Sequence, residues 1–223
     1  MRRATAPVAV LCLFLGTPRL LPAQSSLLYR ETTGPRQVLN RISEEDLPDG
    51  YVMRSRLSDG DMHDVRLDKA LLTVSYHVTS PARRIDYTVV RTGDTLIVEG
   101  TFGGRPVAKR IAIDQRPWYE SLERSVRDLV TGRSRGPLVF WIVNPWDANA
   151  YLVQARTEGD EQVSVDGDEV DAVRLRVVPV GILRFFWSAL YWFRPADGRF
   201  ERSEGVRGGP GTPKTVVELL DKG

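Results

Sequence analysis

Cysteine is nearly absent from this sequence, and histidine is scarce. The single cysteine, Cys12, lies in an apolar N-terminal run, and the two histidines are His63 and His77. The chain beyond that run therefore cannot form a disulfide, a thiolate zinc site, an iron–sulfur cluster or a cysteine nucleophile. A metal site with three histidines is excluded as well, and we expect no cofactor and no metal.

An excess of charge of one sign is also missing. The 223 residues include 31 Lys and Arg and 29 Asp and Glu, and the first 23 residues hold three arginines and no acid. The remaining chain thus has 28 basic and 29 acidic side chains, whereas a nucleic-acid-binding surface needs a basic stripe. With 42% apolar and 27% charged residues, the composition is that of a globular protein that does not bind nucleic acid.

Long apolar runs are missing after the N-terminus, where no segment reaches the roughly 18 apolar residues of a membrane-spanning helix. We therefore expect the mature protein to be soluble and not an integral membrane protein. At the N-terminus, Arg2 and Arg3 precede an apolar run over 6–16, which is the pattern of a secretory signal. We predict a signal peptide over 1–23, with cleavage after Ala23 or Gln24.

An uncleaved anchor and a lipoprotein modified at Cys12 are the alternatives to cleavage. Leu11 stands before Cys12 where a lipoprotein needs a small residue, which favours the cleaved signal. An exported chain without cysteine or a glycosylation sequon is typical of a bacterial periplasmic or secreted protein. The length that remains after cleavage predicts one β-rich domain over 24–223.

Apolar and polar residues alternate along much of the chain, which is typical of strands with one buried face. Segments with this pattern are 72–78, 85–89, 107–113 and 173–177. Turn signals such as Gly103-Gly104, Asp166-Gly167 and Asp197-Gly198 separate the predicted strands. Their spacing of about 8–12 residues favours an antiparallel meander, with about ten strands in all.

The segment 117–131 has helical spacing instead. Pro117 suits the first position of a helix, and Gly132 can end it. The apolar stripe of this predicted amphipathic helix consists of Trp118, Leu122, Val126, Leu129 and Val130. The predicted fold class is therefore all-β with one helix: a curved antiparallel sheet or partly open β-barrel, with the helix packed across the sheet. A two-sheet sandwich is the alternative.

Two stretches, 138–143 and 185–193, are apolar on both strand faces. Either they are central strands covered on both sides, or one face lines a cavity. The candidate ligand-binding residues are Trp141, Trp146, Arg184, Trp187, Tyr191, Trp192 and Arg194. In such a pocket the aromatic rings would contact an apolar ligand, and the two arginines would clamp an anionic head group. The other interpretation is a large aromatic core with two ordinary charges at strand ends.

No group of residues indicates a reaction. The segment 205–215 is similar to a phosphate-binding loop, but a proline stands where such a loop needs glycine before lysine. His63 or His77 could act as a general base with Asp61, Asp64 or Asp86, although solvent-facing histidines are the simpler interpretation. We therefore assign no catalytic residue and expect a non-enzymatic protein.

Two acidic clusters are candidates for a cation site or an acid–base site. They are Asp59, Asp61 and Asp64 in one turn region, and Asp166, Asp168, Glu169 and Asp171 at a hairpin. The first cluster lacks the spacing of a calcium loop. The second lies at an exposed hairpin tip, where the carboxyl pKa would not be raised as acid–base catalysis by paired carboxyl groups requires. Solvated loops are the simpler interpretation of both clusters.

The segment from Trp187 to Leu220 has a recognisable pattern. Its pieces are Tyr191-Trp192-Phe193, Asp197-Gly198, Glu204-Gly205 and Gly208-Gly209-Pro210-Gly211-Thr212-Pro213, with Asp166-Gly167 and Ala172 upstream. Over residues 50–220 the chain resembles exported, β-rich bacterial proteins grouped as a domain family of unknown function, and more distantly the open half-barrels of periplasmic lipoprotein carriers. The resemblance implies a curved antiparallel sheet, in some members with a helix in its concavity, and no catalytic residues. Carriers of that shape hold acyl chains, so the architecture also implies, by analogy, a lipid ligand.

Two functions remain open at this point. The first is an exported non-enzymatic binding or carrier module for an apolar or amphiphilic ligand, held between a curved sheet and a helix. The second is a structural or envelope-assembly protein with a filled aromatic core and a protein partner. A carrier should contain a connected apolar cavity, whereas an assembly protein should expose an apolar patch or an unpaired edge strand.

Overall fold

The computed structural model describes residues 25–134, 136–185, 187–206 and 211–220. Fourteen strands in this part of the chain form one antiparallel sheet. They are β1 (Ser25–Thr33), β2 (Arg36–Leu47), β3 (Gly50–Leu57), β4 (Met62–Asp68), β5 (Thr73–Ser80), β6 (Ile85–Thr92), β7 (Thr95–Phe102), β8 (Arg105–Ala112), β9 (Leu138–Asn144), β10 (Asn149–Val165), β11 (Asp168–Pro179), β12 (Ala189–Phe193), β13 (Phe200–Val206) and β14 (Lys214–Leu219). The signal peptide and cleavage site predicted from the sequence lie outside the described residues.

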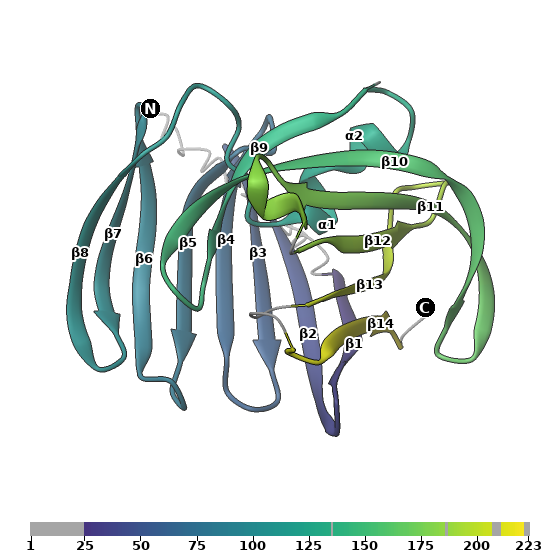
Figure 1. Ribbon diagram of the computed structural model, residues 1–223, viewed down its shortest axis with the longest axis horizontal. Helices are drawn as coiled ribbons and strands as arrows, with labels where there is room; N and C mark the ends of the chain where they lie inside the picture. Colours follow the sequence, from purple (N-terminus) through teal and green to yellow (C-terminus); the bar gives the residue numbers. More distant parts are fainter. Residues whose placement is uncertain (1–24, 135, 186, 207–210, 221–223) are drawn as a thin grey trace, which may run out of the picture.

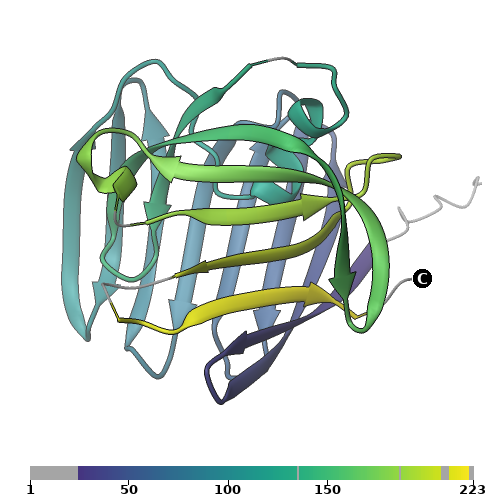
Figure 2. The same cartoon turned by 45° about the vertical axis from the view of Figure 1, so that its right-hand side comes forward.

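The sheet is continuous and is not closed into a barrel. Its strand order runs β8-β7-β6-β5-β4-β3-β2-β1-β14-β13-β12-β11-β10-β9. Strand β1 joins the N-terminal half (β2–β8) to the C-terminal half (β9–β14), because Tyr29 pairs with Asn40 on one side and Leu219 on the other. Strands of the C-terminal half cross over those of the N-terminal half (Figures 1 and 2). The expected fold class is confirmed as a curved antiparallel sheet, and unbroken pairing replaces the alternative of two separate sheets.

Alternating burial follows the alternating sequence on strands such as β6, and a bulge interrupts it on β5. On β6, Ile85, Tyr87 and Val89 are buried and the residues between them face outward. On β5 the pairing shifts by one residue beside Leu67, so Thr73 is buried and Val74 is exposed. The alternation over 72–78 places Val74 on the apolar face and so predicts that it is buried. This prediction is wrong, because a shift of one residue exchanges the two faces of a strand.

A glycine turn and a glycine contact shape the edge of the N-terminal half. Gly103 and Gly104, with φ of 61° and 77°, connect β7 to β8 as the sequence predicts. Gly100 has a φ of 140°, and a Cβ atom there would lie 2.3 Å from the carbonyl oxygen of Asp86. A residue with a side chain would therefore force β7 away from β6.

Two short helices, α1 (Leu122–Ser125) and α2 (Arg127–Val130), replace the single helix expected over 117–131. The backbone of 117–119 is extended instead: Trp141 N donates to Pro117 O, and Tyr119 N donates to Trp141 O at 2.9 Å. On its other side, Thr73 N donates to Trp118 O at 3.0 Å. This segment ties the edge strand β9 to the start of β5, and that pairing outweighs the local helical preference.

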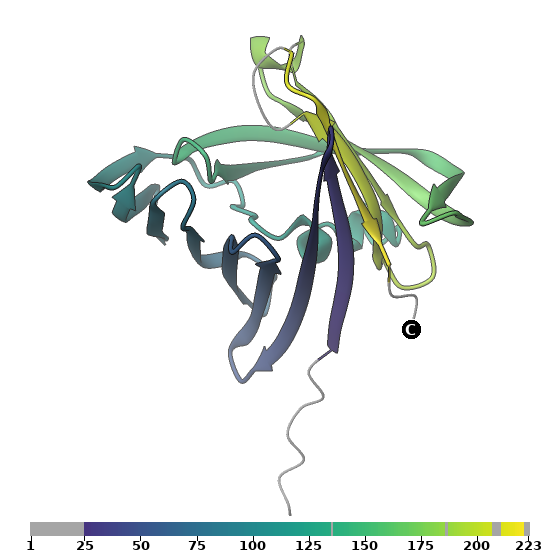
Figure 3. The ribbon, with the colours of Figure 1, turned by 90° about the horizontal axis from the view of Figure 1, so that it is seen from below.

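The apolar stripe predicted for the helix is nevertheless buried as expected. Its five residues, Trp118, Leu122, Val126, Leu129 and Val130, all belong to the apolar core. The two helices lie between the halves of the sheet, as the view from below shows (Figure 3). Within the described part of the chain, no helix is both long and apolar enough to cross a bilayer.

The apolar core has two parts, one for each half of the sheet. The first surrounds Phe140, Leu175 and Phe193 of the C-terminal half together with the helices, and the second surrounds Val78 and Val89 of the N-terminal half. Ile42 on β2 packs against both parts. The interior therefore divides around the middle of β2, and this is where the candidate site lies.

Candidate functional site

A cavity of ≈ 830 Å³ lies between the two halves of the sheet, and we call it the central cavity. A smaller cavity of ≈ 160 Å³ beside α1 shares several of its lining residues, among them Glu120 and Tyr191. The apolar wall of the central cavity consists of Ile42, Met53, Val65, Ile142, Val143, Tyr151, Val153, Trp187 and Tyr191. Both halves contribute to this wall, so the cavity exists only because the sheet curls over itself.

Part of the polar lining of the central cavity lies near the turns of the N-terminal half, and part lies beside α1, where Glu120, Ser121 and Glu123 line it. Asn40 pairs with Leu57 next to the β3–β4 turn, and the Ser55 hydroxyl donates to the Asn40 side chain at 2.7 Å. Farther from the turn the facing pair is Glu44 and Met53, and Met53 contacts the Ser121 hydroxyl beside α1. The cavity thus runs from polar residues near the turns to α1.

The polar end contains a cation stacked on an aromatic ring. The Arg83 guanidinium lies 4.1 Å from the centroid of the Trp146 ring, and its Nη1 is 3.1 Å from the carboxylate of Asp61. His63 contacts the edge of the same indole, and its Nδ1 lies 2.7 Å from the Tyr76 hydroxyl. We call this region, with Arg36 and Asp59, the arginine end.

Glu120 is a carboxyl group held inside the protein near α1. Its Oε1 accepts hydrogen bonds from Trp118 Nε1 and from the backbone N–H of Val143, both at 2.5 Å. These bonds favour the charged form, but burial outweighs them and raises the pKa of Glu120 to about 8. At neutral pH this carboxyl group is therefore mostly protonated, and the α1 end of the cavity carries less charge than its composition implies.

Three of the seven residues proposed from the sequence as ligand contacts line the central cavity. They are Trp146, Trp187 and Tyr191. Trp146 comes from the β9–β10 turn, whose Pro145 carbonyl accepts a hydrogen bond from the Tyr87 hydroxyl across the cavity wall. The Trp187 indole donates to the carbonyl of Val206 at 2.6 Å, which orients its ring. Their contact with a ligand remains a prediction.

The other four residues are not among those that line the central cavity. The Trp141 indole donates to Asp114 at 2.9 Å, and the Trp192 indole donates to Glu161 at 2.6 Å. Arg194 is bonded to Asp197 at the β12–β13 turn. Arg184 is exposed in the short 3₁₀ helix η1 (Ile182–Phe185). Neither Arg184 nor Arg194 is among the residues that line the central cavity.

The histidines and acidic clusters have mostly structural partners. His77 is half-buried, and its Nε2 lies 2.8 Å from Asp86 Oδ1. Asp59 and Asp61 form ion pairs with arginine side chains, and Asp166 pairs with Arg30 at 2.8 Å. In the described residues, no group of three or more His, Cys, Asp or Glu side chains could hold a metal ion.

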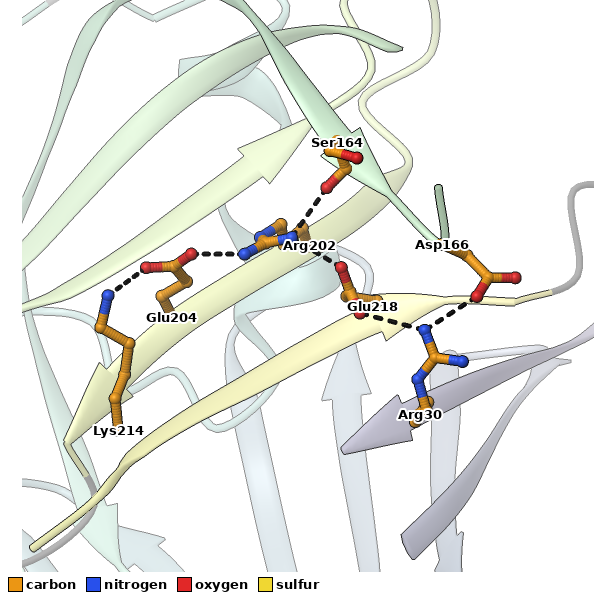
Figure 4. A network of polar contacts seen from close by, with 7 residues as sticks. All are labelled: Arg30, Ser164, Asp166, Arg202, Glu204, Lys214 and Glu218. Atoms are coloured by element: carbon orange, nitrogen blue, oxygen red, sulfur yellow. Dashed lines mark hydrogen bonds and ion pairs between the residues drawn. The ribbon is translucent and has the colours of Figure 1, made fainter. Parts of the chain in front are cut away.

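Asp166 also belongs to a chain of ion pairs on the C-terminal half (Figure 4). Arg202 lies at its centre and donates to Glu204 and Glu218, at 2.5 Å and 2.6 Å. Lys214 extends the chain from Glu204, and Arg30 extends it from Glu218 to Asp166. The network joins β1, β13, β14 and the β10–β11 turn, so its role is to hold neighbouring strands together.

Sequence reasoning missed the arginine end. Arg83 lies in the turn between two alternating segments, 72–78 and 85–89, where a charged residue is ordinary. In the sequence, the acidic turn around Asp59 and Asp61 indicates at most a cation site. Arg83 contacts Trp146 only in the folded protein. No local sequence motif predicts this contact.

The fold is similar to solved structures of bacterial proteins. A beta-barrel-like protein of the domain of unknown function DUF1849 from Brucella abortus has a TM-score of 0.58 at 8% identity, and the match covers 89% of this chain and 96% of that chain. The hypothetical lipoprotein YmcC from Escherichia coli has a TM-score of 0.44 at 10% identity, covering 90% and 85%. A LolA superfamily protein from Nitrosomonas europaea has a TM-score of 0.27 at 12% identity, covering 89% and 83%.

The first of these neighbours confirms the expected resemblance to bacterial β-rich proteins of unknown function. At 8% identity that likeness concerns the fold alone. No protein-family model matches the sequence, and no curated protein matches it.

Proposed function

We propose that this protein is a non-enzymatic binding or carrier module that holds an apolar or amphiphilic ligand in the central cavity. The main support is the cavity itself, whose volume of ≈ 830 Å³ falls within the range of small-molecule sites, about 300–1,000 Å³. A filled aromatic core, as expected of an assembly protein, would leave no space of this size between the two halves.

The lining supports an amphiphile rather than a purely apolar ligand. Side chains such as Ile42, Val65 and Tyr191 provide apolar contact area, while Asn40, Ser55 and Arg83 provide polar groups at the arginine end. A lining that combines apolar contact area with polar and charged side chains suits a ligand that has both an apolar and a polar part.

An envelope-assembly role is the second candidate, and one observation favours it. In the connection between β11 and β12, Val180 is 44% exposed, and Ile182, the first residue of η1, is 74% exposed. Exposed apolar side chains that lie together are often covered by a partner. In that case the protein would be captured with another envelope protein and would carry no ligand.

The proposed binding module acts after export, in the periplasm or as a secreted protein. The support is the pattern of residues 1–23, with its two arginines and apolar run. The mass of the protein purified from the periplasm or medium tests this directly. A mass that starts at residue 24 or 25 is expected, and an intact Met1 would contradict cleavage.

The cavity is tested by filling it. Ile42→Trp places an indole where both parts of the apolar core meet, and Val90→Trp, at a position 40% exposed on β6, is the matched control. Binding of the neutral fluorescent probe N-phenyl-1-naphthylamine should weaken about tenfold or more in Ile42→Trp and change less than about twofold in Val90→Trp. Val153→Phe fills the opposite wall if Ile42→Trp does not fold.

Native mass spectrometry of the detergent-free protein gives an independent readout. An adduct of a few hundred daltons that is lost on denaturation is expected. A bare protein that also fails to bind the probe would contradict the proposed function, as would equal probe binding by the folded Ile42→Trp variant and the wild type.

A further inference from the structure

One turn positions two arginines at the same end of the central cavity. The residues between β3 and β4 include Asp59 and Asp61, two positions apart. Asp59 forms an ion pair with Arg36 at the start of β2, and Asp61 forms one with Arg83 in the β5–β6 turn. Both arginines line the cavity. The two acids therefore serve to hold cations at this end rather than to bind a metal.

Arg83 is the better fixed of the two arginines. Its guanidinium is stacked 4.1 Å from the Trp146 ring centroid and is bonded to Asp61 at 3.1 Å. The Asp61 side chain is only 5% exposed, whereas that of Arg83 is 44% exposed. The acid is thus covered while the cation remains accessible, and a guanidinium held on a ring and a carboxylate loses little freedom when it binds a ligand.

A guanidinium has five N–H donors arranged on more than one edge. The described contacts of the Arg83 side chain use one nitrogen, Nη1, on Asp61. The remaining edge has the geometry that matches two oxygens of a carboxylate or phosphate. An oxyanion is therefore the chemical group that this end of the cavity is built to recognise.

The middle of the cavity suits an apolar chain. Met53, Val65 and Ile142 line its walls between the arginine end and α1. Burial raises the pKa of Glu120 to about 8, so this carboxyl group is mostly uncharged at pH 7. Glu120 would therefore add no fixed negative charge beside such a chain, and Glu123 of α1 is a second carboxyl group that lines this end.

We infer that the ligand is an anionic amphiphile, with a carboxylate or phosphate bound by Arg83 and Arg36 and an apolar chain extending along the cavity toward α1. This inference rests on the proposed function. It adds the charge of the ligand and the direction in which the ligand lies.

The test compares ligands that share one chain length. Myristate, lysophosphatidic acid with a myristoyl chain, tetradecanol and tetradecylamine each displace the neutral probe from the wild type and from Arg83→Gln. The control is Arg66→Gln, which removes an arginine that pairs with a turn aspartate, Asp49, on the exposed surface. Arg36→Gln is the second variant if Arg83→Gln does not fold.

The wild type should bind at least one of the two anions about tenfold more tightly than tetradecanol. Arg83→Gln should remove most of that preference and leave the affinity for tetradecanol within about twofold, and Arg66→Gln should keep the preference. A larger preference for myristate points to free fatty acids, and one for the lysolipid points to phospholipids; both support the inference.

Three results would overturn it: equal binding of anions and alcohol, preference for the amine, or an unchanged anion preference in Arg83→Gln. In each of these cases tetradecanol still binds, so the cavity proposal survives. If neither alcohol nor anion displaces the probe, or if the probe itself does not bind, it is the proposed function that fails.

Discussion

Replacing Glu120 by glutamine tests whether the burial of this carboxyl group makes the protein less stable as the pH rises. Oε1 of Glu120 accepts hydrogen bonds from Trp118 and Val143, and the glutamine carbonyl oxygen can accept the same two bonds. The substitution therefore removes the titration and keeps the contacts. Any change in the pH dependence of stability then reports the cost of charging Glu120.

The magnitude follows from the two pKa values. The pKa of Glu120 is about 8 in the folded protein and 4.5 as its ordinary value. Because the folded state holds the proton more tightly, the contribution to stability is complete below pH 4.5 and is lost as the pH rises toward 8. Each pH unit in this window lowers the unfolding free energy by about 1.4 kcal/mol, and the whole window by roughly 5 kcal/mol.

The assay is urea unfolding followed by tryptophan fluorescence at pH values between 5 and 9. The difference in unfolding free energy between Glu120→Gln and the wild type should grow with pH in favour of the variant. Glu99→Gln, at an exposed position on β7, should have the wild-type profile. A constant difference between Glu120→Gln and the wild type across this range would refute the argument that burial controls this group.

Two further predictions concern the sheet. Arg202→Met removes the centre of the ion-pair network in Figure 4 and leaves two carboxylates, each 17% exposed, without this partner; we expect a loss of about 2 kcal/mol in urea unfolding at low salt and a smaller loss at 1 M NaCl, and no loss would refute a stabilising role. Gly100→Ala should cost about 3 kcal/mol because its Cβ would lie 2.3 Å from the Asp86 carbonyl oxygen. Gly103→Ala, with a φ of 61° and no atom within 4 Å of its Cβ, should cost about 1 kcal/mol, and equal losses at both glycines would show that the close contact is unimportant.

Local sequence patterns do not reveal which aromatic residues line the central cavity. The two-sided apolar stretches of the sequence predict several aromatic ligand contacts. Three of them, Trp146, Trp187 and Tyr191, line the cavity. Trp141 and Trp192 satisfied the same criterion, yet their indoles face acidic partners elsewhere. Composition identifies the aromatic residues of a pocket as a group, but it does not tell which ring faces the interior.

Features that depend on neighbouring residues can be predicted from the sequence alone. Alternation along 85–89 specifies a strand with one buried face, and Gly103-Gly104 specifies a tight hairpin, because side-chain period and backbone freedom are local properties. The burial of the apolar stripe over 118–130 was equally predictable, since those side chains must leave water whatever backbone carries them.

Features that depend on pairing between distant segments follow only from the folded structure. Residues 117–119 are extended because they bond to β9 and β5 at once, which no local propensity reveals. Arg83 reaches Trp146 because the sheet curls until the β9–β10 turn meets the β5–β6 turn. Register and curvature are set by the packing of the whole sheet, so the cavity and its arginine end appear only once the chain has folded.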